Sequence, residues 1–387
     1  MNLADYGLST ERGFLAGFEP AAVTLPAELQ PAREMALRLP ELIPTGHLRS
    51  FLETLAKLDP AAFCASASDA ELRIAMLHYS FLVQAYVWGE PGAPKALPAC
   101  LAVPIWQIGQ AIGQPPLLPY SSYTLENWSR FDAKGPIDLS NIHTLQHFEG
   151  GMDEAWFILV HVAIEARAGE MLLEATKLVG AAKDENAAEI ERALGAMSAV
   201  WDDVNAIFDR MPERCDPYVY FHRVRPWIHG WKDNPALGEG LVYEGVAATA
   251  GKPQAFRGQT GSQSSIVPAV DALLGISHAG DPLRSFLDEL HAYRPPRHRR
   301  YIEDLRAQST LRAVVDKLGI PVIRELYNDN IRKLARFRTR HLEYAATYIN
   351  RQASTAAGND PDVGTGGTPF MRYLKKHRDE AEAHLLT

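Results

Sequence analysis

Apolar positions recur every three or four residues along most of the chain, which is the spacing of amphipathic α-helices. Strict alternation, the pattern of strands, is absent apart from a glycine-containing stretch at 238–251 that is compatible with a short hairpin. We therefore predict an all-α protein. The expected helices cover residues 33–39, 46–58, 69–87, 153–180 with Asp153 as N-cap, 187–210, 267–274, 282–293 and 321–352, with a last one from Pro369 after a Thr368 cap.

Prolines interrupt this helical pattern over residues 94–119. The chain has 387 residues, enough for two domains with sizeable cores. We place the boundary near the end of the proline-rich stretch, which gives a small N-terminal helical domain at 1–118 and a large helical domain at 119–387.

Charge and cysteine usage exclude several classes of protein. The 39 Lys and Arg against 47 Asp and Glu leave a net charge of −8, which argues against nucleic-acid binding. No signal peptide or membrane-spanning stretch is found, so we expect a cytoplasmic protein without a membrane partner. The cysteines (Cys64, Cys100 and Cys215) are far apart and form no C-x-x-C-H motif, which excludes a disulfide framework and covalently attached haem.

Two local patterns resemble functional motifs and fail on inspection. His143 and His147 have the i, i+4 spacing of a helical zinc site, but the glutamate of H-E-x-x-H is missing and no third ligand is evident. A basic cluster follows Tyr293. In an acidic chain we expect it to be a solvated loop or helix start, and it comprises Arg294, Arg297, Arg299 and Arg300.

The predicted helix 321–352 carries a histidine on its apolar face, where His341 falls in line with Phe337 and Tyr348. Such a histidine is usually a core residue with one satisfied hydrogen bond, and this interpretation stays open. The alternative is a haem ligand, because haem iron binds a neutral imidazole and its carboxylates need cations. Three arginines crowd the same turn, namely Arg336, Arg338 and Arg340.

The predicted helix 153–180 repeats this arrangement, with His161 and Phe157 on one apolar face. This second histidine could face the first across a flat cofactor and there bind oxygen or substrate. A buried structural histidine is again the alternative.

Several segments, in this order along the chain, resemble the indoleamine 2,3-dioxygenase family. Together they cover the chain from about residue 115 to the C-terminus, while the N-terminal third matches mainly in helical character. The segments are Leu125-Glu-Asn-Trp128, Gly230-Trp-Lys-Asp-Asn-Pro235, Gly240-Leu-Val-Tyr-Glu-Gly245, Gln263-Ser-Ser265, Asp271-Ala-Leu-Leu-Gly-Ile276, Arg338-Thr-Arg-His341 and Gly364-Thr-Gly-Gly-Thr368.

This resemblance implies an all-α fold whose large domain holds b-type haem, with one iron per chain and O2 as co-substrate. His341 then matches the axial ligand of the iron, and Arg338 matches the partner of a haem propionate. Thr260 and Gly261 match the loop whose backbone lines the pocket.

The resemblance also implies the residues on the substrate side. Arg225 matches the arginine that pairs with the carboxylate of an amino acid, and Thr365 matches the loop residue that closes over the same end. Phe157 and Phe221 fall where the family has aromatic packing, and Tyr120 falls on the pocket wall.

Four positions depart from the usual pattern of the family, two of which, Tyr123 and Thr124, replace smaller or apolar pocket residues. His161 stands where the mammalian enzymes carry serine, and it resembles the distal histidine of tryptophan 2,3-dioxygenases, which can hydrogen-bond the indole N–H. Tyr220 stands where an aromatic residue without a hydroxyl is usual. The pocket is therefore expected to be more polar than is typical for the family.

The resulting functional hypothesis is a haem dioxygenase that opens the indole ring of L-tryptophan or a close analogue to a product of the N-formylkynurenine type. Two alternatives stay open: a haem enzyme that monooxygenates or rearranges a tryptophan derivative, and a haem sensor without turnover. We expect a small-molecule partner, a monomer or weak oligomer, and an electron donor that the sequence does not identify.

Overall fold

Helix α5 (Asp69–Trp88) forms the centre of the N-terminal part of the computed structural model, which describes residues 1–278, 280, 282–355 and 370–387. Nearly every side chain from Leu72 to Val87 is buried, as expected of a helix that is apolar on all sides. Its start is fixed by a capping box, in which Ser68 Oγ accepts the Glu71 N–H and the Glu71 carboxylate accepts the Ser68 N–H.

Helices make up most of the described chain, with only four two-residue strands, as the hydrophobic periodicity predicted. The N-terminal α-helices are α1 (Gln30–Leu37), α2 (Leu39–Leu42), α3 (Leu48–Leu52), α4 (Ala61–Ser66), α5 and α6 (Ala99–Ile112). The later ones are α7 (Met152–Lys183), α8 (Ala187–Asp209), α9 (Pro217–Val219), α10 (Ile266–Leu274), α11 (Pro282–His291), α12 (Pro296–Gln308), α13 (Leu311–Leu318), α14 (Pro321–Tyr348) and α15 (Phe370–Glu382).

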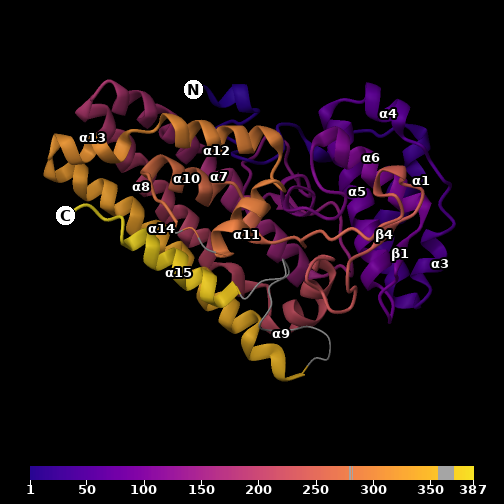
Figure 1. Cartoon of the computed structure of the whole chain (residues 1–387). Helices are drawn as coiled ribbons and strands as arrows, with labels where there is room; N and C mark the ends of the chain where they lie inside the picture. Colours follow the sequence, from indigo (N-terminus) through magenta and orange to yellow (C-terminus); the bar gives the residue numbers. More distant parts are fainter. Residues whose placement is uncertain (279, 281, 356–369) are drawn as a thin grey trace.

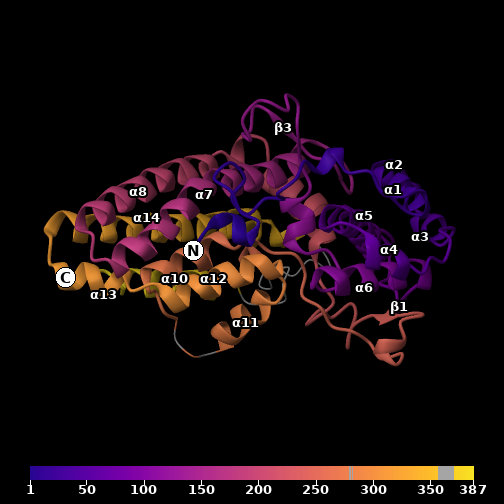
Figure 2. The same cartoon turned by 90° about the horizontal axis from the view of Figure 1, so that it is seen from above.

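The long helices of the C-terminal part run side by side. In Figures 1 and 2, α7, α8, α14 and α15 form one elongated layer. Helices α1 to α6 gather beside one end of this layer. Helix α8 packs against both α7 and α14, and α15 packs along α14. This arrangement leaves the apolar faces of α7 and α14 turned into the same interior.

Two hydrophobic cores result, and the chain crosses between them more than once. The core around α5 also takes in Trp231 and Tyr243, from a segment that follows the long helices α7 and α8. The core around α7, α8 and α14 takes in Leu3 and Phe14 from the start of the chain.

Glycines allow the N-terminal turn to lie directly on α7. A Cβ added at Gly13 would come 2.0 Å from the carbonyl oxygen of Glu165, and one at Gly169 would come 2.3 Å from that of Thr10. Gly13 also has a φ of +54°, a conformation that other residues rarely adopt. Larger residues at either position would push the turn away from the helix.

The strands form two small ladders. Strand β1 (Ala96–Leu97) pairs in parallel with β4 (Val242–Tyr243), and β2 (Ser129–Arg130) pairs antiparallel with β3 (Ile142–His143). The hairpin expected at 238–251 does not form a ladder of its own, and only an isolated antiparallel bridge joins Leu241 to Gln254 there. Its first half extends the N-terminal core instead, because β4 finds its partner in β1.

Two local expectations need correction, and a third is not tested. Helix α6 lies inside the proline-rich stretch: Pro98 precedes its first turn, and the internal Pro104, which costs a helix about 3 kcal/mol, is offset by burial against α5. Asp153 is not the N-cap of α7. Gly151 is, and Asp153 instead accepts the backbone N–H of Asp216. The expected Thr368 cap lies outside the described residues.

Helix α13 was not predicted, and α12 was anticipated only as a helix start, one of the two interpretations of the basic cluster. Helix α12 is rich in arginine, so its apolar stripe is short, and α13 has only eight residues. In the described part of the chain, no helix combines the length and apolar character needed to cross a lipid bilayer.

Candidate functional site

A cavity of about 420 Å³ opens among the long helices, lined mainly by side chains of α7, α10 and α14 and by residues 259–264. Its walls combine aromatic and aliphatic side chains with many polar and charged ones, an arrangement that suits a ligand with an apolar body and charged groups. The apolar and aromatic lining includes Tyr120, Phe157, Ile164, Phe208, Tyr220, Ile266, Val267, Phe337, Tyr344 and Tyr348.

His341 lines this cavity from α14. Burial lowers its pKa to about 4, with a further contribution from the nearby charge of His161, so the imidazole is neutral at physiological pH. No hydrogen bond to its ring is found among the described residues. A Cβ built at Gly261 would lie 4.0 Å from Cε1 of the ring, an ordinary contact distance, so Gly261 lies directly beside His341. The imidazole is therefore neutral, and it has a nitrogen lone pair that no hydrogen bond among the described residues occupies.

His161 lines the same cavity from α7. Its Nδ1 lies 2.7 Å from the carbonyl oxygen of Phe157, one turn earlier. A carbonyl can only accept, so Nδ1 carries the proton and Nε2 has a lone pair. Burial lowers the pKa of His161, and the bond to Phe157 only partly opposes this effect. His161 is therefore a neutral hydrogen-bond acceptor.

A buried carboxyl group, which the sequence analysis missed, lies one turn beyond His161. Glu165 Oε1 accepts hydrogen bonds from Tyr120 Oη at 2.9 Å and from Ser264 Oγ at 2.7 Å. Its Oε2 is buried without a partner in the described structure. Burial raises the pKa of Glu165 to about 7, although both hydroxyls favour the charged form. The i, i+4 spacing from His161 was the available signal.

In the described part of the chain, four arginines line the cavity, namely Arg284, Arg294, Arg306 and Arg338. Two of them, Arg294 and Arg338, are buried. Arg338 Nη2 lies 2.6 Å from a carboxylate oxygen of Asp271. Arg294 is only 2% exposed and donates to the carbonyl oxygens of Ser262 at 2.7 Å and Ser264 at 3.1 Å. The expectation of a solvated cluster is thus wrong for Arg294, because backbone carbonyls of the pocket loop replace water as its partners.

Some of the other residues assigned by resemblance line this cavity, and others do not. Thr260, Gly261 and Tyr220 line it, as do Tyr120 and Phe157. The Tyr220 ring lies 4.8 Å from that of Phe157. Burial raises the pKa of Tyr220 despite the nearby charge of Arg225.

Arg225 and Phe221 are fully buried but are not among the lining residues. The guanidinium carbon of Arg225 lies 5.5 Å from the centre of the Phe221 ring. Thr365 lies outside the described residues.

Three motif residues lie away from the cavity. His143 belongs to strand β3 and His147 follows it in a loop, so the spacing does not place the two on one helix face. Arg340 pairs with Asp209 at 2.6 Å on the outer side of α14. Of the arginines around His341, only Arg338 is buried.

The side chains of the cavity fit a haem. Iron requires a neutral imidazole without a competing partner, which describes His341. The macrocycle requires apolar and aromatic walls, and its two carboxylates require cations such as Arg338.

Comparison with known proteins identifies the family of the chain. Residues 2–384 match the family Indoleamine 2,3-dioxygenase. The chain is 32% identical to Indoleamine 2,3-dioxygenase 2 of Mus musculus, an alignment that covers 100% of this chain and 96% of the relative. It is 28% identical to Indoleamine 2,3-dioxygenase of Saccharomyces cerevisiae, with 98% and 93% covered. It is also 27% identical to a protein named Myoglobin from Haliotis madaka, with 99% and 98% covered. The chain belongs to the indoleamine 2,3-dioxygenase family, a family of oxidoreductases.

Proposed function

We propose that this protein is a haem-dependent dioxygenase that inserts O2 across the indole C2–C3 bond of L-tryptophan or a close analogue and releases a product of the N-formylkynurenine type. The observation that carries the proposal is the pair of neutral imidazoles, His341 and His161, that face one cavity from two helices in a chain of this family. This activity would be the first step of the kynurenine pathway.

His341 would hold one b-type haem per chain, with Arg338 as a partner of a propionate and Thr260 and Gly261 lining the pocket. When bound, this group supplies the iron that activates O2. Protein side chains keep water out of the reaction space, because the rings of Phe157 and Tyr220 cover one side of the cavity.

The substrate would be positioned from both ends. His161 Nε2 accepts the indole N–H, since Nδ1 is committed to the Phe157 carbonyl. Arg225 would pair with the amino-acid carboxylate, the end of the substrate to which the resemblance also assigns Thr365. Arg225 is fully buried close to Tyr220 and does not line the cavity, so a rearrangement near Tyr220 would have to uncover its planar fork for the carboxylate. Such positioning lowers the activation free energy of a reaction by about 7–11 kcal/mol in favourable cases.

Product analysis tests the proposal. Purified protein is reduced, mixed with L-tryptophan and air, and the products are identified by mass spectrometry with ¹⁸O2. We expect both labelled atoms in a ring-opened product, and much weaker turnover of indole, which lacks the carboxylate for Arg225. Incorporation of one oxygen, or a rearranged ring, would instead support the related enzyme that modifies tryptophan derivatives.

One comparison favours a second candidate function, a haem protein without turnover. The relative from Haliotis madaka is named Myoglobin and covers nearly the whole chain. This alternative predicts an oxygenated spectrum that is unchanged by L-tryptophan, with no product. The same experiment therefore decides between the two candidates.

A further inference from the structure

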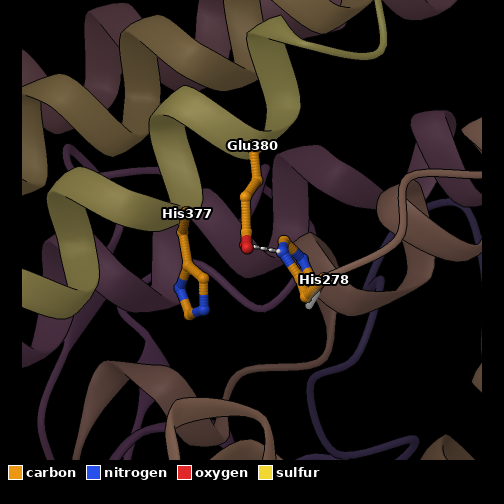
Figure 3. A group of neighbouring side chains, drawn as sticks. All are labelled: His278, His377 and Glu380. Carbon is orange, nitrogen blue, oxygen red and sulfur yellow. Dashed lines mark hydrogen bonds and ion pairs between the residues drawn. The ribbon is translucent and has the colours of Figure 1, made fainter. Parts of the chain in front are cut away.

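A cluster of three potential metal ligands lies at the edge of the cavity, where α15 meets the loop that follows α10. Figure 3 shows His278, His377 and Glu380 converging, with one potential ligand atom from each within 4.8 Å of the others. Helix α15 supplies His377 and Glu380 one turn apart, which places both on one face. The set of two histidines and one glutamate is a known ligand set for zinc that leaves one position open to water.

His377 carries the observation that favours a ligand over ordinary packing. Its Nε2 is buried and has no hydrogen-bond partner in the described part of the chain. A buried ring nitrogen without a partner costs free energy, and a bound cation would remove that cost. The rings of His278 and His377 have centres 4.7 Å apart, so both imidazoles can reach one ion with small side-chain rotations.

His278 already has the second partner that metal-binding histidines usually have. Its Nδ1 lies 2.7 Å from Glu380 Oε2, and its Nε2 lies 3.1 Å from Asp271 Oδ2. A carboxylate that accepts from the distal ring nitrogen fixes the tautomer and makes the other nitrogen a better donor to metal. Asp271 fills this role and also pairs with Arg338.

From this geometry we propose that His278, His377 and Glu380 bind one Zn²⁺ per chain, in a site separate from the proposed haem iron. The ion replaces the hydrogen bond between His278 and Glu380, and the proton of that bond is released to solvent. Lys376, 3.3 Å from the other oxygen of Glu380, is partly exposed and can turn towards water. The bound ion ties α15 to the end of α10. Through Asp271 it also holds the guanidinium of Arg338 in place.

Zinc content measures this site directly. The full-length protein is dialysed against zinc buffered at a known free concentration, and zinc and iron are then counted in the same sample by mass spectrometry. His377→Gln and Glu380→Gln are the test variants, since each keeps the size and polarity of the side chain. His143→Gln is the matched control, a histidine of similar exposure on strand β3.

Wild-type protein and the His143→Gln control are expected to hold one zinc per chain, and each test variant is expected to bind zinc at least about 100-fold more weakly. Circular dichroism shows whether each variant is folded, and if one is not, the other decides. Equal zinc contents in all four proteins, or no zinc in the wild type, would overturn the proposal. Iron content reports haem binding separately, so a zinc-free protein that retains iron would point to a different role for His377, such as hydrogen bonding to an acidic group in the cavity.

Discussion

The two histidines that face the cavity differ in one respect, the partner of the ring. His161 on α7 is bound through Nδ1 to the Phe157 carbonyl, whereas the His341 ring on α14 has no hydrogen-bond partner among the described residues. Both are neutral, because burial lowers the pKa of each. A ring held by its own helix through Nδ1 has a fixed orientation, so its Nε2 can accept a hydrogen bond from one direction. A ring without such a bond keeps a lone pair for a metal.

Similar apolar stripes thus give two chemical roles. The α7 wall continues with Glu165, whose carboxyl is bound by hydroxyl groups, so this side of the cavity offers acceptors and a titratable proton. The α14 wall continues with Arg338, a cation. We therefore expect polar recognition along α7 and binding of the proposed haem along α14.

The largest expected effect separates the two histidines. His341→Ala should lose haem, measured as the loss of the Soret band from protein purified with haem supplied, because no other imidazole takes its place on α14. His161→Ala, measured in parallel, should keep the band, since its ring serves the substrate. Normal haem content in His341→Ala, or equal loss in both variants, would contradict the assignment.

The next effect concerns pH and stability. Glu165 has a pKa near 7 in the folded protein against 4.5 for the ordinary group, so the native state prefers the neutral carboxyl. Its contribution to stability is fully present below pH 4.5 and is lost as pH rises through 7, by about 3 kcal/mol in total. Denaturant unfolding should show wild type losing this amount relative to Glu165→Gln between pH 4.5 and 8.

A matched control is available on the same helix. Glu170 is exposed and pairs with Arg167 at 2.7 Å. Glu170→Gln should therefore follow the pH profile of wild type. If Glu165→Gln also followed it, the carboxyl would be ionised in the folded protein and the proposed titration would be wrong.

The smallest expected effect tests the hydrogen bond from His161. Removing one partner of a buried hydrogen bond costs about 1–3 kcal/mol, so His161→Ala should bind L-tryptophan roughly ten- to a hundredfold more weakly. An analogue with oxygen in place of the indole N–H should bind wild type and variant equally. Dissociation constants from spectral titration give both numbers, and equal losses for the two ligands would assign His161 to packing.

Hydrophobic periodicity predicted the long helices well because their apolar faces are continuous. Helix α8 was expected at 187–210 and occupies Ala187–Asp209. Helix α6 was missed because two prolines outweigh its apolar residues in any local reading, while in the fold it is held by burial against α5. At 238–251 only the single bridge from Leu241 to Gln254 forms locally, for a related reason: the pairing partner of β4 lies about 145 residues earlier in the chain.

The sequence by itself determined the all-α class, the helix faces that carry His161 and His341, and the resemblance that the comparisons confirm. Only the tertiary structure decided how each group is used. It buried Arg294 among carbonyls, raised the pKa of Glu165 by surrounding it with protein, and brought His278 to His377 across about a hundred residues. Periodicity is a local property of a helix, whereas desolvation and side-chain partners depend on what packs against it.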